Sequence, residues 1–279
     1  MKHFSIGKNQ FNSLKKIIVF LVGSAIALPL TICGLAAQGF MTPAIQWMLG
    51  MDSKRAAYNA TVFTLAASLG GIGGILLAGG NSQVISRGII LFITALFAAI
   101  PGIKIRYHAA ESGKAPTLSI IASSIFLVLL MQIIRVNEYS EDNLLYLHTI
   151  IGWCIIGGLY GLFTALFQTP GGSLLTPALF LFTKIGETNS ILLSLFVIAI
   201  GCGITLAFHR MQTSESEEYL PVMITSGLLG GLLAGRMLYP GDNILSGKGF
   251  IIASVIISLL YCLSQINKQP VTVSKSPSI

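Results

Sequence analysis

The chain has 279 residues, of which 53% are hydrophobic and only 10% are charged. A soluble domain carries about a quarter charged residues, so most of the outer surface of this chain has to face lipid rather than water. The formal net charge of +7 does not indicate nucleic-acid binding, because the basic residues stand singly or in pairs between apolar runs, where they set membrane orientation.

The first element is a basic N-terminal segment, residues 1–14, followed by an apolar run. This pattern is superficially that of a signal peptide. The run from Ile17 to Ala37 is, however, long enough to span a bilayer, and it belongs to the internal repeat described below. We therefore expect it to be retained as a transmembrane helix with its N-terminus in the cytoplasm.

Eight apolar runs, each near the 20 residues that a membrane-spanning helix needs, follow one another along the chain. They lie at 15–36, 56–79, 85–105, 117–135, 146–168, 188–208, 219–238 and 249–266. Two shorter apolar stretches, Thr42–Gly50 and Thr176–Ile185, both open with Thr-Pro-Ala. The sequence predicts an all-α integral membrane protein of long helices and half-helices.

The chain contains one unit twice. A shift of 134 residues lays Thr42-Pro43-Ala44 on Thr176-Pro177-Ala178 and residues 112–114 on 246–248, with the apolar runs in register. We therefore divide the chain into tandem transmembrane repeats at 15–136 and 146–267, each with four long helices and one broken or half-helix. A polar linker at 137–145 joins the repeats, and a polar tail covers 268–279.

The half-helices decide the topology. Nine helical residues rise about 14 Å, half a bilayer core, and six extended residues before them reach about 20 Å. An extended segment at 36–41 or 169–175 could thus complete a crossing, giving ten in all; a re-entrant dip would leave eight. With ten crossings, twelve basic residues lie on the inner side of the membrane and five on the outer side. With eight crossings, about nine lie on the inner side and eight on the outer side. The positive-inside rule favours ten, and five crossings per unit would make the repeats inverted.

The two non-helical segments before the half-helices, which we call the breaks, are the candidate solute site. Non-helical backbone at membrane depth is tolerated only where it lies against protein or lines a water-filled cavity. Thr42 and Thr176 stand where an N-cap hydroxyl would, with Pro43 and Pro177 at the first helical position. Two helix N-termini meeting near mid-membrane would favour an anion. Ordinary capping is the alternative interpretation.

The residues that we single out as substrate-binding share small size, a neutral polar group or backbone freedom near these breaks. They are Gln38, Gly39, Thr42, Asn59, Gly171, Gly172, Ser173, Thr176, Ser190 and Ser194. For each polar one taken singly, a satisfied hydrogen bond between helices is the alternative role.

The sequence gives little support for a proton relay, a nucleotide site, a metal site or a catalytic site. The middle of each apolar run lacks Asp, Glu, Lys and Arg, which argues against a carboxylate proton relay. The glycine-rich stretches 68–74 and 227–235 fit close helix packing better than nucleotide binding. The cysteines show no metal-ligand spacing, and motifs of intramembrane enzymes are missing. We expect no metal, no cofactor and no enzymatic activity.

Around these breaks the sequence resembles the TauE/SafE family of sulfite exporter-like permeases. The family pattern in each half is a glycine-rich stretch, an apolar pair, Pro-Ala-Leu, a later glycine, and a basic residue before Ala and Thr-Ser. The second half reads Gly171–Leu179, and the first reads Thr42–Ile45, then Gly50 and Lys54–Thr61. The first half lacks the glycine cluster, and Leu193-Ser194 takes the Thr-Ser place.

The resemblance implies transport of small sulfur-containing anions such as sulfite, thiosulfate, taurine or sulfoacetate-like sulfonates. Our expectation is a secondary transporter in a cell membrane, the bacterial inner membrane by the family likeness. Its partners would be a small anion and lipid, not nucleic acid, and its oligomeric state stays open. A passive anion or small-solute channel and a non-transporting membrane subunit are the alternatives.

Overall fold

The computed structural model describes residues 8–80, 85–112, 115–135, 150–167, 172–183, 185–208, 219–238 and 247–266. These residues form ten α-helices and no strand. The helices are α1 (Lys8–Ile32), α2 (Gln38–Leu49), α3 (Ser53–Leu77), α4 (Ile85–Glu111), α5 (Ala115–Arg135), α6 (Ile150–Phe167), α7 (Leu175–Phe182), α8 (Glu187–Phe208), α9 (Leu220–Met237) and α10 (Gly247–Ile266). The predicted all-α fold is confirmed, and each predicted long run coincides with a helix.

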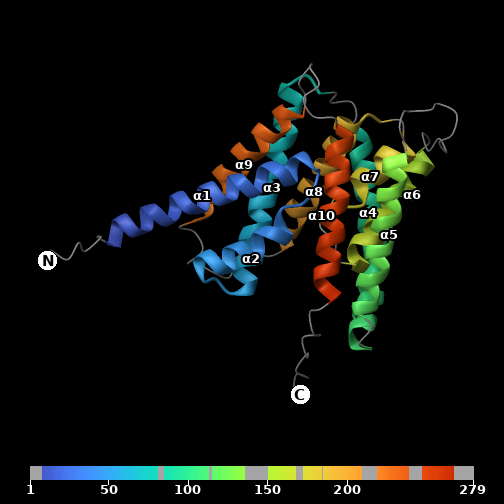
Figure 1. The fold of residues 1–279 in the computed structure, drawn as a ribbon, viewed down its shortest axis with the longest axis horizontal. Coiled ribbons are helices and arrows are strands. Elements are labelled where there is room, and N and C mark those ends of the chain that lie inside the picture. Colours follow the sequence, from blue (N-terminus) through green and yellow to red (C-terminus); the bar gives the residue numbers. More distant parts are fainter. Residues whose placement is uncertain are drawn as a thin grey trace.

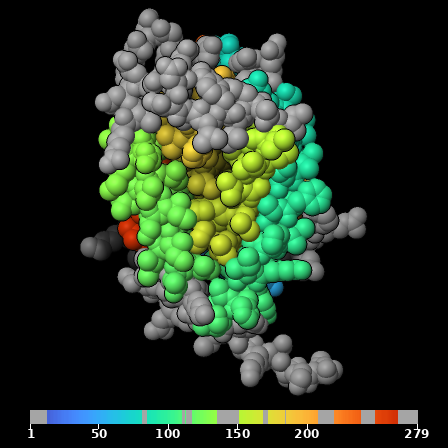
Figure 2. All heavy atoms as spheres, turned by 90° about the vertical axis from the view of Figure 1, so that its right-hand side faces the viewer, coloured from blue at the N-terminus to red at the C-terminus, as the bar shows by residue number. Residues whose placement is uncertain are grey.

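Six of these helices are long and apolar enough to cross a membrane: α1, α3, α4, α5, α8 and α9. Shorter apolar helices cover 151–167 in α6 and 249–264 in α10. Figure 2 shows α6 flanked by α5 and α4 on one face of the molecule. These three helices expose large apolar side chains, among them Phe97, Val128 and Leu159, as expected of a surface that meets lipid.

The helices form two groups joined through α8 (Figure 1). On one side α9 packs against α1 and α3, and α2 lies along α3. On the other side α4 packs against α6, and α5 packs against α10. Helix α8 contacts α3, α4 and α7. The fourth helix of each half, α4 or α9, thus packs on helices of the other half, so the two halves interlock.

Glycines bring α3 and α9 into backbone contact. A Cβ at Gly231 or Gly235 of α9 would overlap the carbonyl oxygen of Ala67 or Gly71 on α3, and a Cβ at Gly70 would overlap Leu228 of α9. The α4–α6 pair is built in the same way. This confirms that the two glycine-rich stretches serve close helix packing, in which small residues let membrane helices approach and gain dispersion energy.

The contacts also give the helix directions on the first side. Gly23 of α1 lies against Phe63 of α3, and Thr31 lies against Gly71, so α1 and α3 run parallel. Phe63 contacts Gly227 of α9 while Gly71 contacts Gly235, so α9 is parallel to both.

Helix α8 runs the other way. Near the end of α3, Ile75 packs in a cluster with Ile191 near the start of α8. One turn earlier on α3, Gly71 faces Leu195. Leu65, earlier still, packs on a cluster that contains Cys202, further along α8. Later positions of α3 therefore contact earlier positions of α8, so the two helices are antiparallel.

The break after α1 is a compact turn, not the extended segment that we expected at 36–41. The amide of Leu35 donates to the carbonyl of Leu30 at 2.8 Å, and that of Gly34 to Thr31 at 3.0 Å. With Gly34 at φ 66°, this is a Schellman motif, which satisfies the last carbonyls of α1. Helix α2 then begins at Gln38, four residues before the predicted start, and its twelve residues rise about 18 Å.

We predict that Gly231→Ala weakens the interlock of the two halves. The new methyl group would overlap the Ala67 carbonyl oxygen, a backbone atom that cannot rotate away. We expect a loss of about 1–3 kcal/mol in unfolding free energy, the usual cost of overpacking. Denaturant unfolding in mild detergent measures it.

The matched control is Gly201→Ala in α8, where a Cβ would meet nothing within 4 Å. This substitution should leave stability unchanged or raise it by up to about 1 kcal/mol, because alanine favours helix more than glycine does. Equal behaviour of the two variants would contradict the packing argument.

Candidate functional site

The turn after α1 and the turn before α7 meet inside the protein. A Cβ on Gly172 would overlap the carbonyl oxygen of Gly34, and both glycines have positive φ, 85° and 66°. Only glycine adopts such backbone without strain and allows so close an approach. The breaks of the two halves are therefore packed together through backbone at Gly34 and Gly172.

Helix α8 holds this contact in place. The Ser194 hydroxyl donates a hydrogen bond of 2.9 Å to the Gly34 carbonyl oxygen, and it lies against Gly172 as well. One turn earlier, the Ser190 hydroxyl donates to the Gly186 carbonyl of its own helix at 3.3 Å. Both serines are fully buried. Ser194 thus links the first half of the chain to the second, whereas Ser190 is satisfied locally.

Two hydroxyl groups at the start of α7 are buried without a partner. Ser173 and Thr176 have no exposed surface, and no group of the described residues hydrogen-bonds to either side-chain oxygen. The Thr176 oxygen lies 2.7 Å from where a Cβ of Gly34 would stand, so it faces the contact between the breaks. Buried hydroxyls normally have partners, and an unsatisfied one costs about 1–3 kcal/mol. Together with Gly34, Gly172 and Ser194 we call these residues the hydroxyl cluster.

Helix α6 contributes residues that the sequence did not single out. The Tyr160 hydroxyl accepts a hydrogen bond of 3.3 Å from the Gly172 amide. One turn later, the buried Thr164 hydroxyl also has no partner among the described residues. Tyr160 and Gly34 could not be found by pattern, because an aromatic residue in an apolar run and a glycine at a helix end are both ordinary.

Helix α2 does not begin as predicted. Thr42 is not an N-cap: it lies in the second turn of α2, and its hydroxyl donates to the Gln38 carbonyl at 2.8 Å. Pro43 is correspondingly inside the helix. Gly39 faces the ring of Tyr261 on α10. Gln38, Gly39 and Thr42 therefore lie in the first two turns of α2, whereas the hydroxyl cluster is built by the second half and Gly34.

Thr176 is likewise not an N-cap. Helix α7 begins at Leu175 after the cap residue Leu174, so Thr176 is the second helical residue and Pro177 the third. The Thr176 amide is already bonded to the Gly172 carbonyl at 3.0 Å. The Thr176 hydroxyl therefore makes no capping bond at the start of α7.

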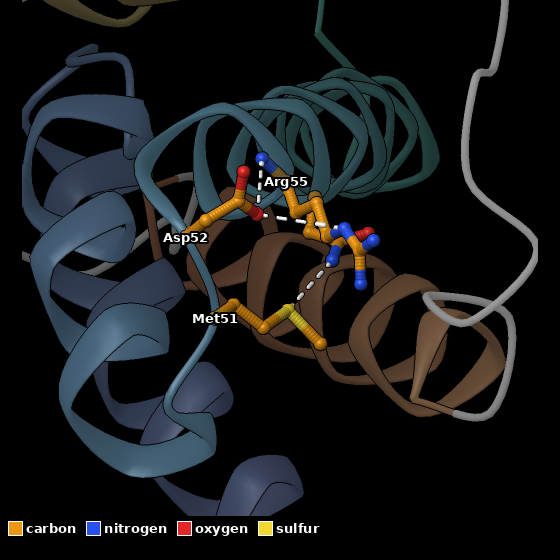
Figure 3. Close-up of polar contacts among 4 residues, drawn as sticks. Met51, Asp52 and Arg55 are labelled. Atoms are coloured by element: carbon orange, nitrogen blue, oxygen red, sulfur yellow. Dashed lines mark hydrogen bonds and ion pairs between the residues drawn. The ribbon is translucent and has the colours of Figure 1, made fainter.

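Asn59 lies in the second turn of α3, beside the loop that joins the C-terminal end of α2 to α3. Its amide nitrogen contacts the sulfur of Met51 at 3.2 Å, and its side-chain oxygen is buried without a partner among the described residues. Asp52 caps α3, accepting from the Arg55 amide at 3.4 Å and pairing with its guanidinium at 3.5 Å (Figure 3). Asn59 is thus tied to this loop rather than to the hydroxyl cluster. Gly171 falls outside the described residues.

The chemistry available to the hydroxyl cluster is neutral. Among the described residues, no group of three or more His, Cys, Asp or Glu side chains is placed to hold a metal ion. The cluster offers hydroxyl donors at the N-terminal, positive end of α7. Such a set suits a small anion or a neutral polar molecule that brings its own acceptors.

Comparison with known proteins returned no matching protein-family model, no curated protein and no solved structure. The functional argument consequently rests on the residues and geometry described above.

We predict that Ser194→Ala destabilises the junction of the breaks, because the Gly34 carbonyl loses its hydroxyl donor while remaining buried. The expected loss of unfolding free energy is about 1–3 kcal/mol. Ser190→Ala is the matched control one turn away, because the Gly186 carbonyl keeps its bond to the Ser190 amide at 3.0 Å. Equal unfolding midpoints for the two variants would show that the hydrogen bond from Ser194 to Gly34 does not stabilise the junction.

Proposed function

We propose that this chain is a secondary membrane transporter of small anions, with the hydroxyl cluster as its substrate site. The observation that carries the proposal is the pair of buried hydroxyls of Ser173 and Thr176, neither of which has a hydrogen-bond partner among the described residues. A buried hydroxyl without a hydrogen bond destabilises the folded protein, so two such groups side by side need an explanation. A transported solute that binds between the breaks supplies the missing acceptors.

The cluster favours an anion for electrostatic reasons. An anion accepts from O–H donors, and charge-assisted hydrogen bonds are roughly twice as strong as neutral ones. The start of α7 adds the positive end of a helix dipole. Neutral donors hold an anion without a permanent countercharge, so release to the other side is not opposed by a strong ion pair.

The directions of α3 and α8 support the inverted repeat that we propose for the carrier mechanism. Helices α3 and α8 begin at Ser53 and Glu187, separated by the 134-residue shift of the sequence repeat, and they run antiparallel. Parallel α1 and α3 favour five crossings per half over four, because a re-entrant α2 would leave them antiparallel. Inverted repeats that rock about a central site with broken helices are a known basis of alternating access.

The topology has its own test. We predict that a cysteine at the N-terminus and one replacing the exposed Asp52 react with a membrane-impermeant maleimide from the same side, the cytoplasm. A cysteine replacing the exposed Leu77, at the other end of α3, should react from the opposite side. The measurement uses sealed vesicles of both orientations and a chain whose four native cysteines are removed. N-terminal and position-52 labelling from opposite sides would instead indicate eight crossings.

The substrates proposed are sulfur oxoanions and sulfonates: sulfite, thiosulfate, and taurine- or sulfoacetate-like compounds. This narrower class rests on the likeness of Gly171–Leu179 to sulfite exporter-like permeases. Each such ion carries acceptor oxygens on a compact group, which matches short hydroxyl donors. On the same likeness we propose a bacterial inner membrane as the location and a gradient as the driving force.

We predict saturable counterflow of radiolabelled sulfite or thiosulfate in proteoliposomes. Ser173→Ala and Thr176→Val should each raise the half-saturating concentration by about 10- to 100-fold, the loss of one hydrogen bond to a charged ligand. Thr42→Val should have little effect, because the Thr42 hydroxyl is bonded to its own helix.

Thr64→Val is the matched control for the substitution at Thr176. Thr64 is also buried, and its hydroxyl donates to the Ala60 carbonyl of its own helix at 2.7 Å. Flux that never saturates and shows no counterflow would point to a channel. Counterflow that Ser173→Ala and Thr176→Val leave unchanged would place the site elsewhere.

A further inference from the structure

The junction of the breaks contains more hydrogen-bond acceptors than donors. The Ser194 hydroxyl gives its only proton to the Gly34 carbonyl oxygen, 2.9 Å away. A hydroxyl oxygen has two lone pairs, so Ser194 can only accept from a further partner, and the carbonyl oxygen also has a second lone pair. Among the described residues, no second donor is bonded to either oxygen. The Gly34–Ser194 pair therefore offers lone pairs to a ligand, not protons.

A third oxygen faces the same place. The Gly34 carbonyl oxygen and the Ser194 hydroxyl oxygen both stand against Gly172, where a Cβ would overlap the two of them. The Thr176 hydroxyl oxygen lies 2.7 Å from where a Cβ on Gly34 would stand. It is fully buried and has no hydrogen-bond partner among the described residues. Three neutral oxygens, from the turn after α1, from α7 and from α8, thus surround the two glycines.

The two helix ends at the junction have opposite polarity. Helix α1 ends at Ile32, two residues before Gly34, and its C-terminal end carries the negative pole of the helix dipole. Helix α7 begins at Leu175, two residues after Ser173, and its N-terminal end carries the positive pole. In secondary transporters, non-helical carbonyls and helix C-terminal ends bind Na⁺, whereas helix N-terminal ends bind anionic groups of the substrate. The Gly34 side therefore suits a cation and the Ser173 side an anion.

An anion in the hydroxyl cluster has no buried countercharge in the protein. Every buried polar side chain among the described residues is a serine, a threonine or an asparagine. A cation bound beside the anion would offset the loss of its hydration, because opposite charges attract strongly where the dielectric constant is low. Neutral hydroxyl and carbonyl oxygens without a carboxylate suit a monovalent ion better than a divalent or transition metal.

We propose that Gly34, Ser194 and Thr176 bind a sodium ion next to the substrate anion, and that this sodium ion is the coupling ion of the carrier. The inference rests on the proposed function and adds the ion whose gradient drives it. The carbonyl oxygen of Gly34 and the hydroxyl oxygens of Ser194 and Thr176 contribute lone pairs to the cation. Thr176 keeps its proton for the anion, so one hydroxyl contacts both ions. Cation and anion then cross together and leave the protein neutral.

Sodium binding to the purified protein in detergent tests the site without relying on transport. The readout is the thermal unfolding temperature as sodium chloride replaces choline chloride stepwise at constant total chloride. This exchange holds the ionic strength and the anion constant. The wild type should show a rise that saturates with Na⁺. Thr176→Val should move the midpoint of this rise to about tenfold higher Na⁺ or beyond, because one oxygen ligand is lost.

Two further variants separate ligation from folding, since each protein is compared with itself in choline. Thr176→Ser keeps the hydroxyl oxygen and should keep the wild-type Na⁺ midpoint. Ser194→Ala removes another oxygen and should raise the midpoint as Thr176→Val does. Thr64→Val is the matched control, because the buried Thr64 hydroxyl is bonded within α3. Its Na⁺ midpoint should equal that of the wild type.

Equal Na⁺ midpoints for Thr176→Val and Thr64→Val would overturn the cation site. So would a wild type whose unfolding temperature is the same in sodium and in choline. Sulfite counterflow of equal rate in sodium and in choline, alongside either result, would refute the cation site while leaving the proposed function standing. Saturable stabilisation by Na⁺ in a protein without any counterflow would refute the carrier and leave the cation site.

Discussion

The backbone contact between Gly34 and Gly172 is the constraint on which the rest of the structure depends. The carbonyl oxygen of Gly34 lies directly against Gly172. Because of this contact, α1 has to end at a Schellman turn and α7 has to begin inside the protein. The Ser194 hydroxyl fixes this junction by bonding to Gly34. Any side chain at either glycine would separate the halves, so the turn geometry and the position of the buried hydroxyls are set together.

The interlock of the halves has a second basis in the glycine-lined pairs α3–α9 and α4–α6. Lipid surrounds these helices, so apolar burial alone gives them no reason to associate, and close backbone approach supplies dispersion contacts instead. Gly70, Gly231 and Gly235 bring α3 and α9 together around the first half, and Gly157 and Gly161 do the same for α6 and α4. Each pair joins a helix of one half to a helix of the other.

Polarity is distributed unevenly between the two breaks. The second half contributes Ser173, Thr176 and Ser194 to a buried neutral cluster, whereas the first half contributes the backbone of Gly34, and the Thr42 hydroxyl is bonded within α2. Repetition of a sequence unit therefore does not repeat the chemistry. Thr42 and Thr176 occupy equivalent positions in the sequence repeat. The Thr42 hydroxyl bonds to its own helix, whereas the Thr176 hydroxyl faces the junction and has no partner among the described residues.

The sequence alone determined the helical class, the positions of the long helices, and the short Thr-Pro helices, because hydropathy and helix length follow directly from the need to satisfy backbone groups in lipid. It also pointed to Ser173, Thr176 and Ser194. The starts of α2 and α7 were misjudged, since Pro can stand inside the early turns of a helix and capping depends on backbone geometry. Gly34 and Tyr160 acquire their places only when helices distant in sequence pack together, and the local sequence pattern does not encode that packing.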